Sequence, residues 1–100
     1  METHTFDITL ELELKGSYFD VQVFLEDKQI KSGWVQQGNK TIRTLKGYET
    51  NADKLKVELC IEGKSGASGE LTVKITAKSD TILKEIVSDT SNCAHTYIQL

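Results

Sequence analysis

The sequence predicts an all-β fold, a single antiparallel β-sandwich (immunoglobulin-like or jelly-roll-like) of about eight short strands across residues 1–100. Three observations lead to this prediction. Apolar and polar residues alternate with a period of two along most of the chain, as they do in half-buried strands. Turns containing glycine separate many of these runs. The length of 100 residues permits one domain and argues against two.

Two strongly alternating segments begin the chain. In residues 6–14 the apolar positions alternate with acidic residues and threonine, which indicates a long strand with one buried face. A turn at 15–17 separates it from a second alternating segment at 19–25. The apolar residues expected to face the core are Phe6, Ile8, Leu10, Leu12, Leu14, Phe19, Val21, Val23 and Leu25. Phe24 falls on the polar face, so we expect that face to be partly covered there.

The middle of the chain alternates less clearly. Residues 30–37 include Trp34 and are expected to form a strand, and the β-branched segment 41–45 is expected to form another. Residues 47–53 are polar and are predicted to form a loop.

The clearest alternation occurs in residues 55–61 and 71–77, on either side of a loop rich in glycine and serine. We predict that these two segments form a hairpin folded about Gly66, because its register matches apolar with apolar residues and opposite charges with each other. The predicted cross-strand pairs are Leu59 with Val73, Val57 with Ile75, and Glu58 with Lys74.

The end of the chain fits two types of secondary structure. In residues 79–88 the spacing of Ile82, Leu83, Ile86 and Val87 fits either a short helix or a strand buried on both faces. The strand is favoured because all neighbouring elements are predicted strands. Residues 94–100 are expected to form the closing strand.

The balance of charges limits the classes of partner. The chain has 12 basic and 15 acidic residues, a formal net charge of −3, and Arg43 is its only arginine. We therefore expect no nucleic-acid partner, since phosphate binding relies on clustered basic groups and on arginine in particular. No apolar run approaches the roughly 18 residues of a membrane-spanning helix. Residues 1–7 lack the features of a secretory signal, so a cytoplasmic location is expected if Met1 is the native start; otherwise the location is unknown.

Cys60 and Cys93 are the only cysteines. We favour two small, partly buried residues without a bridge, and a single disulfide is the alternative if the chain is exported. Cys93 and His95 are two residues apart and should point to the same side of a strand, but this spacing of about 7 Å is too long for a direct hydrogen bond. A structural zinc site also needs four ligands. The sequence therefore predicts no catalytic residue, no metal and no cofactor.

Four residues are the predicted ligand contacts. Trp34 lies in a polar stretch next to glycine, and Tyr48, Asn51 and Asp53 lie in the predicted loop 47–53. An aromatic ring beside amide and carboxylate groups is typical of loops that bind sugars, and aromatic residues also anchor protein partners. We therefore expect a non-catalytic binding module that uses loops at one end of the sandwich to hold a glycan or a protein. The competing interpretation of Trp34 is a side chain that fills the core.

The alternative function is a structural or assembly subunit. The chain contains no proline, which many proteins use to protect the exposed edges of sheets. Phe24 on a polar face, together with Tyr18, would then form an interface. Such a subunit would associate with itself through strand edges or an apolar face and form a homo-oligomer.

Overall fold

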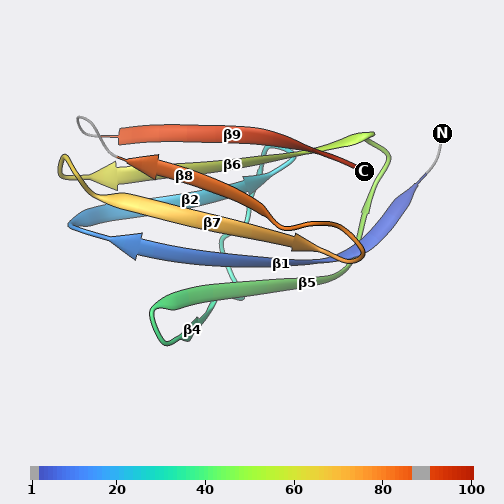
Figure 1. The fold of residues 1–100 in the computed structure, drawn as a ribbon, viewed down its shortest axis with the longest axis horizontal. Coiled ribbons are helices and arrows are strands. Elements are labelled where there is room, and N and C mark those ends of the chain that lie inside the picture. The colour runs from blue at the N-terminus through green and yellow to red at the C-terminus, as the bar shows by residue number, and fades with distance from the viewer. Residues whose placement is uncertain (1–2, 87–90) are drawn as a thin grey trace.

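Residues 3–86 and 91–100, which the computed structural model describes, form nine strands and no helix. The strands make two antiparallel sheets (Figure 1), so the predicted antiparallel β-sandwich is confirmed. The strands are β1 (His4–Lys15), β2 (Tyr18–Leu25), β3 (Lys28–Gln29), β4 (Val35–Gln37), β5 (Lys40–Thr50), β6 (Lys54–Gly63), β7 (Ser68–Ile75), β8 (Thr81–Ile86) and β9 (Ser91–Gln99). The first sheet has the order β4-β5-β1-β7-β8, and the second has the order β3-β2-β6-β9.

The core lies between the two sheets and consists of the inward-facing aliphatic side chains. Ile8, Leu10 and Leu12 in β1 are buried, as their alternation predicts. The same holds for β6, where Leu55, Val57, Leu59 and Ile61 are all fully buried. Burial of one such side chain contributes about 1.5–3 kcal/mol to the free energy of unfolding. The result is an elongated molecule with extents of 43 × 25 × 23 Å.

The predicted hairpin about Gly66 is wrong. β6 pairs with β2 and β9, whereas β7 pairs with β1 and β8. The connection at 64–67 therefore crosses from one sheet to the other, which Figure 1 shows at the end where β6 finishes. Leu59 and Val73 are both buried, but they reach the core from opposite sheets. Alternation identifies the buried face of each strand and leaves its hydrogen-bonded partner open, because two stacked strands bury the same pattern as two paired ones.

Four other expectations can be compared with the boundaries and register of the observed strands. Segment 30–37 contains β4 only at its end, and the irregular segment 30–34 precedes it. β5 continues to Thr50, so Tyr48 lies on a strand rather than in a loop. Phe19 is 73% exposed instead of facing the core, because the register of β2 with β6 shifts between Tyr18 and Asp20. In 79–88 the favoured strand is confirmed as β8, but the expected burial on both faces is wrong, since Leu83 is buried while Ile82 and Ile86 are exposed. Val87 lies outside the described residues.

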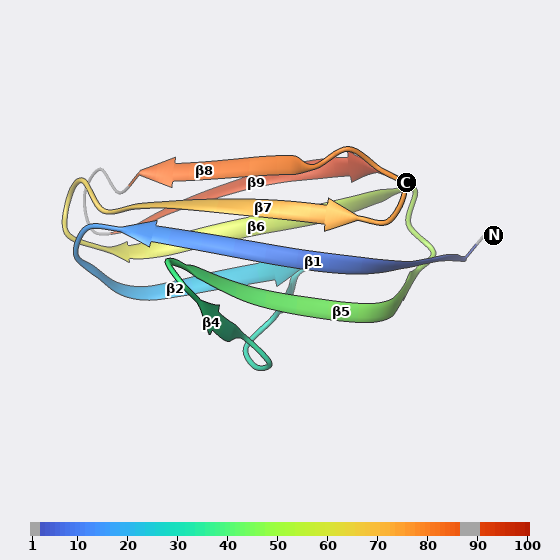
Figure 2. The same ribbon diagram turned by 60° about the horizontal axis from the view of Figure 1, so that its bottom comes forward.

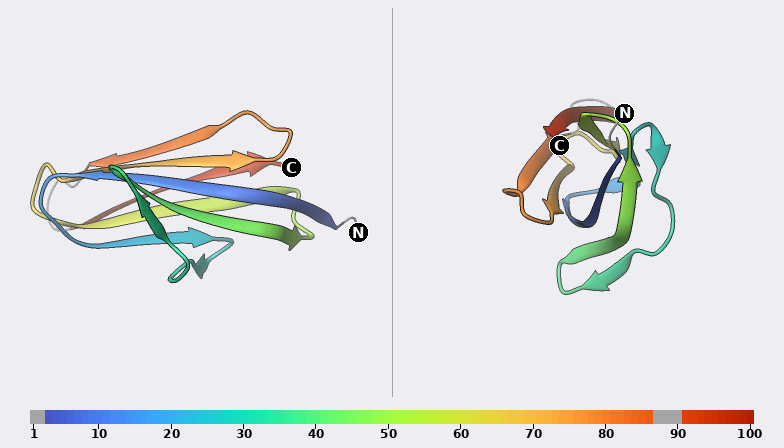
Figure 3. Two further views of the ribbon diagram at one scale, coloured as in Figure 1. Left: turned by 90° about the horizontal axis from the view of Figure 1, so that it is seen from below. Right: turned by 90° about the vertical axis from the view of Figure 1, so that its right-hand side faces the viewer.

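The two long edges of the sandwich are closed differently. At one edge the last strands of the two sheets, β8 and β9, contact each other (Figure 3), and we call this the β8/β9 edge. At the opposite edge lie the short strands β3 and β4, and segment 30–34 crosses there from the second sheet to the first (Figure 2). We call it the β3/β4 edge.

Cys60 and Cys93 form a disulfide, so the favoured interpretation of two unbridged cysteines is wrong and the alternative is correct. The bridge joins directly opposed residues of β6 and β9, whose Cα atoms are 4.1 Å apart. It lies on the outer face of the second sheet, because the neighbours Leu59 and Ile61 point into the core.

Among the described residues there is no helix long and apolar enough to cross a membrane.

Candidate binding groove beside Trp34

A groove opens between the two sheets at the β3/β4 edge and has a volume of about 320 Å³. Its lining combines residues from β1, β2 and β5 with residues of segment 30–34 and β3. The lining residues are Leu12, Leu14, Asp20, Val21, Val23, Gln29, Ile30, Lys31, Trp34 and Thr41. Leu12 and Val23 belong to the buried core, so the floor of the groove is apolar. Its volume lies at the lower end of the range of small-molecule sites.

The local backbone holds the Trp34 ring in place. The indole Nε1–H donates a hydrogen bond of 2.9 Å to the carbonyl oxygen of Ile30, and the partly buried ring packs against the core. Gly33 has a φ of +84°, which a residue with a side chain rarely adopts, and this turns the chain immediately before Trp34. Arg43 Nε donates a hydrogen bond of 2.8 Å to the carbonyl oxygen of Ser32 and attaches the segment to β5. The ring is therefore fixed before any ligand arrives.

Three polar residues contribute to the lining beside the apolar floor, although Asp20 lies opposite Glu62 and Gln29 opposite Phe24, on the outer face of the second sheet. Asp20 and Lys31 are exposed and Gln29 is partly buried. In the part of the chain that the structure describes, none of these three side chains has a hydrogen bond or ion pair. Their carboxylate, ammonium and amide groups are therefore free to bind hydroxyl or amide groups of a ligand. A groove of this kind can hold a molecule that has both an apolar face and several hydroxyl groups.

Tyr48, one of the predicted contacts, is engaged within the protein. Its hydroxyl donates a hydrogen bond of 2.7 Å to Glu26 Oε2, and its ring lies 5.8 Å from that of Phe6. Burial raises the pKa of the Tyr48 hydroxyl well above its ordinary value, and the Glu26 carboxylate raises it further. Thr50 also donates its hydroxyl to Glu26, so this group joins the end of β5 to the turn after β2.

Asn51 and Asp53 lie beyond the end of β5. Asn51 Oδ1 accepts a hydrogen bond of 2.9 Å from Thr3 Oγ1, and the Asp53 carbonyl oxygen accepts one of 2.9 Å from Leu100 N. Asn51 lines a second, open depression of about 400 Å³, which does not include Trp34. The structure therefore does not gather the four predicted contacts into one site, and Trp34 is the one that lines the groove.

The groove residues Asp20, Gln29 and Lys31 were not predicted. They come from β2, β3 and segment 30–34, and only the course of the chain at the β3/β4 edge brings them to Trp34. The nearest signal in the sequence is Lys31 itself, which is close to Trp34 along the chain.

The two predicted interface residues differ in exposure and in their place on β2. Tyr18 is 47% exposed at the start of β2, beside the exposed Phe19. Phe24 is partly buried on the outer face of the second sheet, where it lies opposite Glu58 on one side and Gln29 on the other. An interface through these residues stays a prediction.

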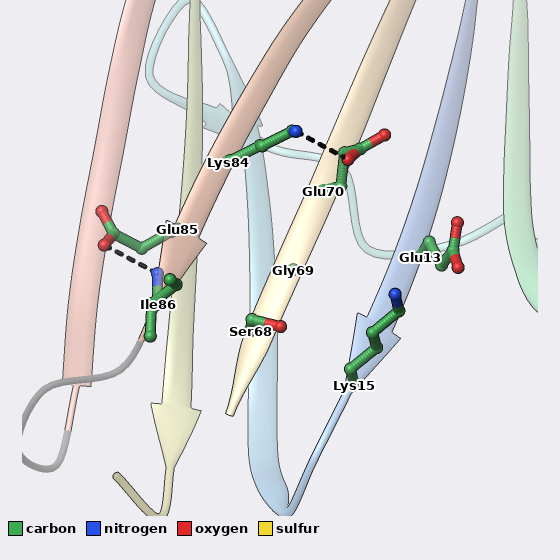
Figure 4. A pocket seen from close by; sticks show the side chains of 8 residues that line it. All are labelled: Glu13, Lys15, Ser68, Gly69, Glu70, Lys84, Glu85 and Ile86. Atoms are coloured by element: carbon green, nitrogen blue, oxygen red, sulfur yellow. Dashed lines mark hydrogen bonds and ion pairs between the residues drawn. The ribbon is translucent and has the colours of Figure 1, made fainter. Parts of the chain in front are cut away.

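A smaller depression of about 170 Å³ lies on the outer face of the first sheet (Figure 4). Its lining is mainly charged, and Lys84 Nζ forms an ion pair of 3.5 Å with Glu70 Oε2 across β7 and β8. Figure 4 shows Lys15 and Glu13 at one side of it and Glu85 at the other. It offers no aromatic surface, so the groove beside Trp34 is the better candidate.

Comparison of the chain with known protein families, with curated proteins and with solved structures found no match.

Proposed function

We propose that the chain is a non-catalytic binding module and that the groove beside Trp34 holds one sugar unit of a glycan. The observation that supports this proposal is a groove lined by a fixed, partly buried indole and by three polar residues whose side chains have no partner among the described residues. A sugar ring has an apolar face that packs on an aromatic ring and hydroxyl groups that bind to carboxylate and amide groups. Asp20 would accept those hydrogen bonds, Gln29 would accept or donate them, and Lys31 would donate.

Two features favour a binding module over an enzyme. Cys93, the candidate nucleophile that the sequence places two residues from His95, is held in a disulfide and has no thiolate. The groove itself contains one carboxylate, that of Asp20, so it lacks the pair of carboxyl groups that most glycoside hydrolases use.

A glycan array followed by calorimetric titration of each hit tests the proposal. We expect Trp34→Ala to weaken binding by about 30-fold, the effect of losing a contact of about 2 kcal/mol, and Asp20→Asn to weaken it by about tenfold. Tyr97→Ala serves as the control. It removes an exposed aromatic ring on β9, which β6 separates from the groove strand β2 in the second sheet. Trp34→Phe retains a ring if the alanine variant is poorly folded. A glycan that binds equally well to the Trp34 and Tyr97 variants would contradict the proposal.

The second candidate is self-association along the outer strand of the first sheet. Ile82 and Ile86 of β8 are 55% and 62% exposed, and within the described residues β8 pairs with β7 alone. Exposed aliphatic residues on a strand at the end of a sheet favour pairing with another chain. Light scattering tests this: a dimer that Ile82→Lys converts to a monomer would support it, and a monomer at all concentrations would exclude it.

The disulfide also bears on location. Such bonds persist mainly in oxidising compartments. We therefore propose that the oxidised form of the chain works in an oxidising environment, where glycans are also abundant, and the cytoplasmic location stays an untested prediction.

A further inference from the structure

The outer face of the second sheet carries two adjacent cross-strand pairs of metal-binding residues. Cys60 in β6 lies opposite Cys93 in β9, and two residues along, Glu58 lies opposite His95. Side chains separated by two residues point to the same face of a strand, so all four project from the outer face. The strands β6 and β9 thus bring two sulfur atoms, an imidazole and a carboxylate to one surface, although the two cysteines are 33 positions apart in the sequence.

Three of the four ligand groups are already close together. A carboxylate oxygen of Glu58 and the Sγ atoms of Cys60 and Cys93 lie within 4.8 Å of one another. The short Cα distance of 4.1 Å between the cysteines is that of a pair without backbone hydrogen bonds, in which opposed side chains are closest. The pattern repeats every two residues, so Glu58 and His95 form a pair of the same kind.

His95 is the fourth group, and it lies beside this cluster in the cross-strand pair with Glu58. It is exposed, and its ring lies edge-to-face against Tyr97 at 5.9 Å. Consecutive outward residues on a strand are about 7 Å apart. The short cysteine side chains would hold a metal close to their own pair, and the longer glutamate and histidine side chains would reach it from the next pair.

We propose that Cys60, Cys93, Glu58 and His95 bind one Zn²⁺ ion when the disulfide is reduced. Two thiolates, an imidazole and a carboxylate complete a tetrahedral zinc site. The oxidised chain lacks both thiolates and leaves only Glu58 and His95 as ligands, which are too few. The metal site therefore exists only in the reduced protein, and none of its residues lines the groove beside Trp34.

The chemistry requires a two-electron reductant, which a dithiol can supply. One of its thiolates attacks one sulfur of the disulfide and releases the other cysteine, and its second thiolate then attacks the mixed disulfide and releases the first cysteine. The dithiol gives up two electrons and two protons and becomes a disulfide, while Cys60 and Cys93 become thiols. Zn²⁺ then replaces the two thiol protons, which are released to water. Cys93 is exposed on a strand at the end of its sheet, so the reductant can reach it.

Titration of the chain with Co²⁺, before and after reduction with a phosphine, tests the proposal. Cobalt replaces zinc in such sites and shows charge-transfer absorption only when thiolates bind it. We expect one Co²⁺ per reduced chain with this absorption, displacement by Zn²⁺, and no such absorption from the oxidised chain or from Cys60→Ser/Cys93→Ser.

Two pairs of variants identify the other ligands. His95→Ala and Glu58→Gln should each weaken zinc binding to the reduced chain by at least about tenfold, since even groups that only orient a ligand cost that much. His4→Ala and Glu62→Gln are the matched controls, and Glu62 lies on the same face of β6, on the far side of Cys60. We expect neither control to change affinity.

Equal losses in a variant and its control would overturn the assignment of that ligand, and a reduced chain that binds metal no better than the oxidised one would overturn the site. The four side chains lie outside the core, so the variants should fold, and circular dichroism checks this. As an independent measurement, Zn²⁺ should raise the Tm of the reduced chain and should raise that of reduced His95→Ala less.

Discussion

The two long edges of this sandwich show two ways of closing a pair of sheets. At the β8/β9 edge, strands of 6 and 9 residues contact each other, and a disulfide joins β9 to β6. At the β3/β4 edge, the last strands have only 2 and 3 residues, and the Trp34 ring helps to cover the core instead. Two longer strands cover the core at the first edge, whereas at the second edge a groove opens beside the large side chain that covers it. The candidate ligand site is therefore at the edge where regular structure is weakest.

The disulfide provides the largest test of this difference. Cys60→Ser/Cys93→Ser removes a cross-link between residues separated by 33 positions, and such a loss typically lowers the free energy of unfolding by about 2–4 kcal/mol. Urea denaturation of the variant and of the oxidised parent measures the effect. The parent reduced without metal should lose a similar amount. A change of less than about 0.5 kcal/mol would mean that contacts of β8 and β9 alone hold this edge.

The strands of regular alternation were predicted well, and the physical reason is simple. In β1 and β6 every second residue is aliphatic, so a shift by one position would expose the whole apolar set. Their buried residues could therefore be named from the sequence. The strand that pairs with each of them could not be predicted. Glu58 could lie opposite Lys74 or opposite basic residues at other positions, and both arrangements fit the sequence equally well. The structure places it opposite His95, and the false hairpin register concealed the group of metal-binding residues.

The candidate groove was predicted only in part, for a related reason. Trp34 stood out as the single tryptophan in a polar stretch. Tyr48 and Asn51 were placed with it because residues 47–53 resembled a loop, but β5 extends through Tyr48, and that side chain binds Glu26 instead. Asp20 reaches the groove because β2 packs against β1 and β5 across the sandwich. The sequence around Asp20 does not indicate this packing.

Gly33 provides the corresponding test at the β3/β4 edge. Its φ is +84°, and a Cβ atom at this position would lie 2.7 Å from Arg43 Cζ. Gly33→Ala should therefore cost about 1–2 kcal/mol for the left-handed backbone, and somewhat more for the displaced Arg43. Thermal unfolding measures the loss, and tryptophan fluorescence should report a more exposed Trp34.

Gly38→Ala is the matched control for that experiment. Gly38 also has a positive φ, of +62°, but nothing lies within 4 Å of the position of a Cβ atom. It should show the backbone cost without the collision. If both alanine variants are equally destabilised and both retain the fluorescence of the parent, Arg43 does not hold segment 30–34 and the groove is less rigid than the hydrogen bond to Ser32 implies.

The smallest expected effect concerns Glu11, which links the two halves of the first sheet. Its carboxylate lies 3.3 Å from Lys40 Nζ of β5, toward the β3/β4 edge, and 3.0 Å from Lys74 Nζ of β7, toward the β8/β9 edge. The hydrogen bond from Lys74, with a further one from Lys40, lowers the pKa of Glu11 below its ordinary value of 4.5. The carboxylate is therefore favoured in the folded state, and we expect Glu11→Gln to cost about 0.5–1 kcal/mol at pH 7.

The sign of the pH dependence follows from that lowered pKa. Because the pKa is lower in the folded than in the unfolded chain, the stabilisation is complete above pH 4.5 and is lost as the pH falls through the folded value. The difference between the parent and Glu11→Gln should thus shrink in acid, as urea denaturation between pH 7 and pH 3 would measure. Glu13→Gln is the control, since Glu13 accepts a hydrogen bond from Asn39 and has no ion pair within the described residues. A difference that stays constant in acid would show that Glu11 stabilises the sheet by packing and that its charge does not couple the two edges.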